Sequence, residues 1–263
     1  MNFHQLLEKM VSANASDMFV TAKLAVSAKI NGELQPITDH VLSADESLGL
    51  VYNAMNEKQV RQFDEEKECN FAISIENIGR FRISAFWQRD MAGMVIRRIV
   101  TDIPDLEELG LPSVLKDVVM SKRGLLLFVG GTGTGKSTSM ASLIGYRNRN
   151  SRGHILTIED PVEFVHEHGK CMVTQREVGL DTESFDAALK SSLRQAPDVI
   201  LIGEIRSQAT MEYALSFAET GHLCIATLHA NNANQAIDRI MHLVPAEQHG
   251  KLLFDLALNL RGI

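Results

Sequence analysis

The chain has 263 residues, enough for two domains or one large one, and 45% of them are hydrophobic, which supports a packed core. A net charge of −7 argues against a protein that wraps nucleic acid, because neutralising phosphates requires an excess of lysine and arginine. No apolar stretch approaches the length of a membrane span, and no signal-peptide pattern opens the chain. Cys69, Cys171 and Cys224 fit no metal spacing, so we expect buried free thiols in a cytoplasmic protein.

Residues 1–100 are expected to form a small α+β domain that begins with a helix and a hairpin. Apolar residues recur at helical spacing from Phe3 to Val11 and predict an amphipathic helix. Alternation over residues 26–30, followed by Asn31 and Gly32, predicts a β-hairpin with a tight turn.

A further helix and three strands complete this domain. Ser43 and Glu46 have the spacing of a capping box, so a helix should begin near Ala44 and run toward Gln62. Antiparallel strands are expected at residues 71–76, 80–87 and 94–99. In the middle strand, apolar side chains share one face, whereas its arginines lie on the other.

A change of pattern follows at residues 101–112, which contain two prolines and four carboxylates and predict a linker. Beyond it, residues 113–263 alternate between strands and helices, which predicts a mainly parallel sheet covered on both faces. The expected strands are at residues 125–129, 154–158, 171–175, 199–202 and 223–227. The expected helices are at about residues 113–121, 136–147, 184–195, 208–219, 233–242 and 246–260.

The segment GGTGTGKS at residues 130–137 has the pattern G-x-x-x-x-G-K-[ST] between a strand and a helix. Glycines let backbone N–H groups surround phosphates, and a helix N-terminus favours anions. Lys136 would reach the β- and γ-phosphates, and Ser137 would ligate Mg²⁺. The alternative is a glycine-rich turn that fits the pattern by chance. We predict ATP or GTP binding by Gly131, Thr132, Gly133, Thr134, Gly135, Lys136, Ser137 and Thr138.

A first acidic segment, ILTIEDPVEF at residues 155–164, follows another expected strand. Its carboxylates Glu159, Asp160 and Glu163 would stand at the carboxyl end of that strand, where they can hold the hydration shell of Mg²⁺ and polarise a water. The alternative is a solvated acidic turn, but a neighbouring phosphate loop favours the functional interpretation.

A second acidic segment, PDVILIGEIR at residues 197–206, has the form of the strand beside Mg²⁺ in P-loop NTPases. Its acid is Glu204, which follows Gly203 where an Asp usually stands. The alternative is an ordinary buried strand that ends in a surface glutamate.

Two histidines flank the last expected strand in TGHLCIATLHAN, residues 220–231. Neither His222 nor His229 has a cysteine or carboxylate at metal-ligand spacing, which argues against zinc. A histidine at a strand end can sense a phosphate or be structural, and the spacing leaves both readings open.

Taken together, these segments resemble the secretion-superfamily ATPases that power type IV pili and type II secretion. The resemblance is strongest to the retraction branch of PilT and PilU, and to the PilU type within it. The segments that carry it are GGTGTGKS (130–137), TIEDPVEF (157–164), VTQREVGLDT (173–182), LRQAPDVILIGEIR (193–206) and AETGHLCIATLHANNANQAIDRI (218–240), with ECNFAI (68–73) and IGRFRISAF (78–86). Family members continue beyond the position of Ile263, so we expect a truncated chain.

The resemblance implies a PAS-like N-terminal domain, a RecA-like P-loop ATPase domain, and ATP sites between domains and subunits of a homo-hexameric ring. Within the ATPase domain it implies Glu163 as general base and Glu204 as support for Mg²⁺ and water. It implies that His222 and His229 couple the phosphate state to domain position.

Two arginines on the N-terminal strands, Arg82 and Arg97, resemble the γ-phosphate arginines of the family. The alternative is that they are charged residues on the open face of a sheet.

The function implied is an ATP-driven motor of pilus retraction, accessory to a partner retraction ATPase. It would act at the cytoplasmic side of the inner membrane on a pilus platform protein, without nucleic acid. Two alternatives remain: a RecA-type nucleic-acid translocase, which the acidic charge disfavours, and a nucleotide-gated scaffold with little hydrolysis.

Overall fold

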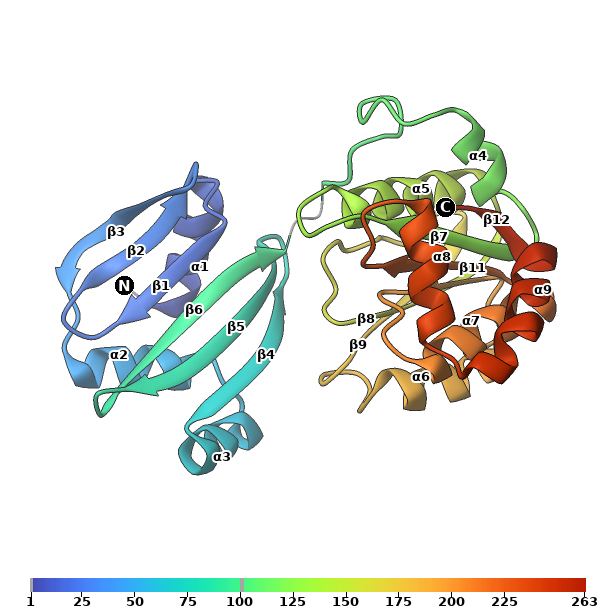
Figure 1. Cartoon of the computed structure of the whole chain (residues 1–263). Helices are drawn as coiled ribbons and strands as arrows, with labels where there is room; N and C mark the ends of the chain where they lie inside the picture. Colours follow the sequence, from blue (N-terminus) through green and yellow to red (C-terminus); the bar gives the residue numbers. More distant parts are fainter. Residues whose placement is uncertain (1, 100–101) are drawn as a thin grey trace. The chain divides into compact units, whose positions relative to one another are not determined.

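The computed structural model describes residues 2–99 and 102–263 (Figure 1). The chain divides into two compact units, Met1–Val100 and Thr101–Ile263. Leu106, in the expected linker, is buried in a core cluster of the second unit together with Val119 and Ile144. The three cysteines are free and buried, as predicted.

The first unit is an antiparallel sheet with the strand order β3-β2-β1-β6-β5-β4. Its strands are β1 (Asp17–Thr21), β2 (Ala25–Ile30), β3 (Glu33–Val41), β4 (Glu68–Ile75), β5 (Gly79–Gln88) and β6 (Met91–Ile99). Its helices are α1 (Phe3–Ser12), α2 (Ala44–Asn53) and α3 (Glu57–Glu66). The helices pack on the inward-facing strand residues, and Leu7, Val51, Phe63 and Ile83 share one core. This agrees with the predicted α+β domain.

The hairpin prediction is confirmed, because Asn31 and Gly32 connect β2 to β3 with φ values of 51° and 86°. Two positive φ values in a two-residue turn are the geometry that Asn-Gly favours. Strand β1 was not anticipated, although it lies between β2 and β6 and so joins the two halves of the sheet.

The single helix expected over residues 44–62 is wrong, because two helices form there. Asn56 begins α3: its Oδ1 accepts hydrogen bonds from the backbone N–H groups of Lys58 and Gln59, both at 3.0 Å. The hydrogen bonding is reciprocal, since the Gln59 side-chain Oε1 accepts from the Asn56 backbone N–H at 2.9 Å. This capping box satisfies the first free N–H groups of a new helix, which favours a break at this point.

The second unit is a parallel sheet with the order β12-β7-β11-β10-β8-β9. Its strands are β7 (Gly124–Val129), β8 (Gly153–Glu159), β9 (Cys171–Glu177), β10 (Val199–Ile202), β11 (Leu223–Leu228) and β12 (Leu260–Gly262). Its helices are α4 (Val114–Val119), α5 (Lys136–Asn150), α6 (Phe185–Ser192), α7 (Gln208–Glu219), α8 (Ala233–His242) and α9 (His249–Asn259). Strand β12 was not anticipated; it pairs with β7 where the last expected helix ends.

Alternating side chains of these strands enter two separate cores. Leu125, Ile200 and Cys224 pack with α6, α7, α8 and α9, whereas Leu126 and Ile225 pack with α4 and α5. Both faces of the sheet are therefore covered, as the sequence predicts. Because the strands are parallel, the segments that follow β7, β8, β10 and β11 all leave the same edge of the sheet (Figure 1).

Candidate nucleotide-binding site

The loop between β7 and α5 owes its shape to glycine. Gly133 and Gly135 have φ values of 76° and 90°, in the left-handed region that side chains disfavour. At Gly130 an added Cβ would lie 2.5 Å from Thr134 Oγ1. Thr134 donates its hydroxyl hydrogen to the Gly131 carbonyl at 2.9 Å, which closes the loop on itself. The backbone therefore curls as a phosphate loop requires.

The lysine of this loop lies against the loop's own backbone. Lys136 Nζ donates hydrogen bonds to the carbonyls of Gly130 at 2.9 Å and Gly131 at 2.7 Å. Its ammonium group stands at the first turn of α5, where the helix dipole also attracts anions. Phosphate oxygens can replace the two carbonyls as acceptors, because an ammonium group is a compact point charge with three donors.

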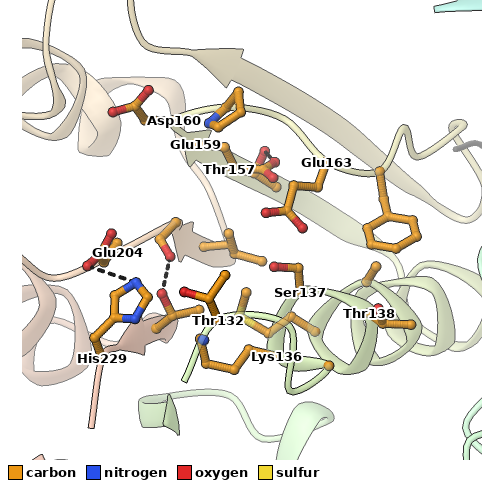
Figure 2. A pocket seen from close by; sticks show the side chains of 18 of the residues that line it. Thr132, Lys136, Ser137, Thr138, Thr157, Glu159, Asp160, Glu163, Glu204 and His229 are labelled. Carbon is orange, nitrogen blue, oxygen red and sulfur yellow. Dashed lines mark hydrogen bonds and ion pairs between the residues drawn. The ribbon is translucent and has the colours of Figure 1, made fainter. Parts of the chain in front are cut away.

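A cavity of about 410 Å³ lies between this loop and the ends of β8, β10 and β11 (Figure 2). Its volume is that of an ordinary ligand pocket. The predicted residues that line it are Thr132, Gly133, Gly135, Lys136, Ser137, Thr138, Glu159, Asp160, Glu163, Glu204 and His229. Gly131 and Thr134 belong to the same loop but face neighbouring hollows.

Three carboxylates from the end of β8 and the segment after it line this cavity, and two of them, Glu159 and Glu163, lie in different environments. Glu163 is exposed, and Figure 2 shows its carboxylate projecting toward Ser137. Burial raises the pKa of the Glu159 carboxyl, although hydrogen bonds from Thr157 Oγ1 at 2.6 Å and Gln175 Nε2 at 3.2 Å oppose that effect. Of these two, Glu163 has access to solvent and Glu159 is engaged by protein groups.

Glu204 stands after β10 and is held by two neighbours. Its Oε2 lies 2.6 Å from Arg206 Nε, and its Oε1 lies 3.3 Å from His229 Nε2 (dashed line, Figure 2). Arg206 also lies 3.4 Å from Asp160, so the network joins the ends of β8, β10 and β11. The Glu204 side chain is only 14% exposed.

Gly203 follows β10 at the position where P-loop NTPases usually have an aspartate, and its surroundings explain why the acid, Glu204, comes one residue later. A Cβ at Gly203 would lie 3.1 Å from the Glu159 Cα, because β8 and β10 approach closely where they end. The Gly203 carbonyl also accepts a hydrogen bond from Thr227 Oγ1 at 2.5 Å. The position directly after β10 therefore suits a residue without a side chain, and the acidic side chain is found at the next residue, Glu204.

Several residues of the cavity escaped the sequence analysis. Phe164, His166 and Arg206 line it, and Thr157 orients Glu159. His166 is the most perturbed of them, since burial lowers its pKa to about 4. No periodicity or motif spacing marks the irregular segment that contains His166, so the sequence offers no signal for it.

His222 does not line this cavity, and its role at a nucleotide stays a prediction. Its carbonyl accepts a hydrogen bond from Gly124 N at the beginning of β7, whereas the phosphate loop follows the end of that strand. Its Nδ1 lies 3.2 Å from both Thr220 Oγ1 and the Phe217 carbonyl. The two predicted histidines stand at opposite ends of β11. Of the two, His229 is the one at the carboxyl end, next to the phosphate loop.

The two candidate arginines belong to the first unit. Arg82 on β5 and Arg97 on β6 are partners in the sheet register. Arg97 Nε lies 2.8 Å from Asp17 Oδ1, and the Arg97 side chain is 65% exposed. The ion pair with Asp17 gives Arg97 a structural role within the first unit. A role of either arginine at a nucleotide stays a prediction.

Comparison with known proteins identifies the family. Residues 2–260 match the model of the family described as Type II/IV secretion system protein. The chain is 60% identical to the type IV pilus ATPase PilU of Pseudomonas aeruginosa, covering 100% of this chain and 69% of PilU. It is 41% identical to the type IV pilus retractation ATPase PilT of the same organism, covering 100% of this chain and 76% of PilT.

A solved structure agrees with these matches. The crystal structure of the pilus retraction motor PilT with bound ADP matches with a TM-score of 0.94 at 38% identity, covering 99% of this chain and 76% of that one. The predicted fold class and the predicted resemblance are confirmed. In the described parts of the chain, residues 2–99 and 102–263, no helix has the length and apolar character to cross a membrane. The chain belongs to the Type II/IV secretion system protein family, and within it to the pilus ATPases related to PilU and PilT.

Proposed function

We propose that this chain hydrolyses ATP and drives the retraction of type IV pili, the motion that underlies twitching. The observation that carries the proposal is one cavity in which a phosphate loop meets acidic residues from the ends of β8 and β10 and His229 from the end of β11. The names of the relatives support the same activity, since PilU is a pilus ATPase and PilT a retraction ATPase that binds ADP.

The loop would bind the phosphates of ATP through its backbone N–H groups, with Lys136 at the β- and γ-phosphates. The donors beside it fit Mg²⁺, because Ser137 and Glu204 supply hard oxygen atoms and Mg²⁺ keeps most of its waters. When bound, Mg²⁺ would neutralise charge shared by the β- and γ-phosphates.

Glu163 is the general base in this proposal. It is exposed to solvent within the cavity, and the ionised carboxylate would take a proton from the water that attacks the γ-phosphate. Through its contact with Glu204, His229 would respond to whether the γ-phosphate is present. Arg82 and Arg97 would complete the site from the first unit and stabilise the transition state.

The assembly proposed is a homo-hexameric ring at the cytoplasmic face of the inner membrane. It would act beside a partner retraction ATPase on the platform protein of the pilus. ATP binding would close one unit against the other, and product release would reopen them, which is a hinge-type transition. Nucleic acid has no part in this cycle.

Steady-state phosphate release tests the proposal against its two rivals. Hydrolysis that DNA or RNA leaves unchanged supports a pilus motor, whereas strong stimulation by either would favour a nucleic-acid translocase. Nucleotide binding without turnover, alone and with the partner ATPase, would favour a scaffold. Twitching of cells with this protein alone, the partner alone or both tests the accessory role: normal retraction with this protein alone would contradict it.

The proposed metal ligand predicts a specific phenotype. Glu204→Gln should slow hydrolysis and weaken the apparent Mg²⁺ affinity about 10–100-fold, because an amide is a poorer ligand than a carboxylate. Phosphate release titrated with Mg²⁺ measures this. The control is Glu219→Gln, the same change at an exposed glutamate at the end of α7. An unchanged Mg²⁺ requirement in Glu204→Gln would remove Glu204 from the metal site.

A further inference from the structure

The segment that carries Glu163 is held in place by a neighbouring strand. Residues 160–166 leave β8 as an irregular loop, and β9 runs parallel to β8 beside it. On one side of Glu163, the Val162 backbone N–H donates to Glu177 Oε2 at 3.1 Å. On the other side, Gln175 of β9 contacts both Phe164 and His166. The base therefore stands between two fixed stretches of backbone.

Gln175 makes three hydrogen bonds, and each needs a different part of its carboxamide. Its Nε2 donates to the Phe164 carbonyl at 2.9 Å and to Glu159 Oε1 at 3.2 Å. Its Oε1 accepts from the His166 backbone N–H at 2.7 Å. A backbone carbonyl can only accept and a backbone N–H can only donate, so these partners fix which end of the amide is which.

No other side chain of this length supplies the same set of bonds. A carboxylate at this position would keep the bond to His166 N but would lose both donors and face the Glu159 carboxylate. A methionine would match the shape and lose all three bonds. The geometry thus requires a group that donates twice and accepts once.

We propose that Gln175 is a positioning residue for ATP hydrolysis: it anchors the backbone at Phe164 and His166, ties that backbone to Glu159, and so holds the Glu163 carboxylate over Ser137. This inference rests on the proposed function. Gln175 need not touch nucleotide, since it is absent from the lining of the cavity. Its effect passes through the orientation of Glu163, and a displacement of the base by about 1 Å can cost about 10²-fold in rate.

The decisive substitution is Gln175→Met in the full chain. It should lower kcat about 10²-fold while the affinity for a fluorescent ADP analogue stays unchanged. Thr174→Val is the matched control on the same strand: it removes the hydrogen bond at 2.9 Å between Thr174 Oγ1 and the buried His154 Nε2, away from the loop. The control should keep the wild-type kcat, which separates positioning from general weakening of β9.

A double-variant cycle shows whether Gln175 acts through the base. In the Glu163→Gln background, Gln175→Met should cause no further loss, because there is no carboxylate left to align. Equal losses in both backgrounds would overturn the proposal, and so would a wild-type kcat in Gln175→Met. If wild-type protein shows no hydrolysis, or Glu163→Gln hydrolyses normally, the proposed function or its base fails instead.

Gln175→Glu provides a second test should the methionine variant not fold. It keeps the length and the acceptor, and protonation of the new carboxyl restores one donor. Its kcat relative to wild type should therefore be low at alkaline pH and rise toward mildly acidic pH. A ratio that does not change with pH would overturn the proposal.

Discussion

Two loops at the edge of the parallel sheet contribute to the cavity, and they are stabilised in opposite ways. The phosphate loop, residues 130–136, is fixed from within, because Thr134 and Lys136 donate to its own carbonyls and Gly133 and Gly135 adopt positive φ. The acidic loop, residues 160–166, is fixed from outside by side chains of β9. A short sequence can therefore specify the first loop, whereas the second depends on a strand that comes later in the chain.

This difference has consequences for how each loop tolerates change. A substitution in the phosphate loop acts directly on ligand contacts. The acidic loop can lose its function through Gln175 or Glu177, which lie outside it.

Lys136→Ala should abolish detectable hydrolysis and leave the fold intact. The ammonium group acts where transition-state charge gathers on the phosphates, and in phosphoryl transfer such electrostatic stabilisation supplies most of the catalysis. Phosphate release and circular dichroism measure the two properties. Turnover equal to the wild type would show that the loop does not bind the reacting phosphates.

Glu163→Gln should still bind ATP but turn over about 10²–10⁴-fold more slowly, the usual loss for a general base. Glu167→Gln is the matched control, because Glu167 is also exposed and follows in the same irregular segment but does not line the cavity. Single-turnover hydrolysis after nucleotide binding separates chemistry from affinity. Equal rates for the two variants would place the base elsewhere.

His166 should make the acidic loop sensitive to pH. Its pKa is lowered to about 4 in the folded chain from an ordinary value of 6.5, so the unfolded state binds the proton more readily. Stability from the neutral imidazole is therefore present above about pH 6.5 and is lost as pH falls toward 4, by about 2–3 kcal/mol.

The measurement is the free energy of unfolding in a pH series, for wild type and His166→Gln. The difference between the two curves isolates His166 from carboxylates that also titrate at low pH, such as Glu46, whose pKa its hydrogen bonds lower to about 2. The stability of wild type relative to His166→Gln should fall as pH falls from about 6.5 toward 4. Curves that stay parallel would contradict a buried neutral His166.

The sequence analysis succeeded where a signal is local and failed where partners are distant. The Asn31-Gly32 turn and the glycine loop were found because each depends on neighbouring residues. Strand β1 was missed, although it lies between β2 and β6. The break before α3 had a local signal in Asn56 and Gln59, which the continuous helical interpretation overlooked.

Local sequence patterns were enough to predict the alternation of strands and helices between β7 and α9, the phosphate loop, and the acids at the ends of β8 and β10, because period, composition and glycine placement encode these features locally. Tertiary structure alone decided which edge each residue reaches. His229 faces the loop, whereas His222 lies at the opposite end of β11, since a strand separates its two ends by its full length. It also brought Gln175 against Glu159 and the acidic loop, a contact that depends on the pairing of β8 with β9 and on no pattern within either strand.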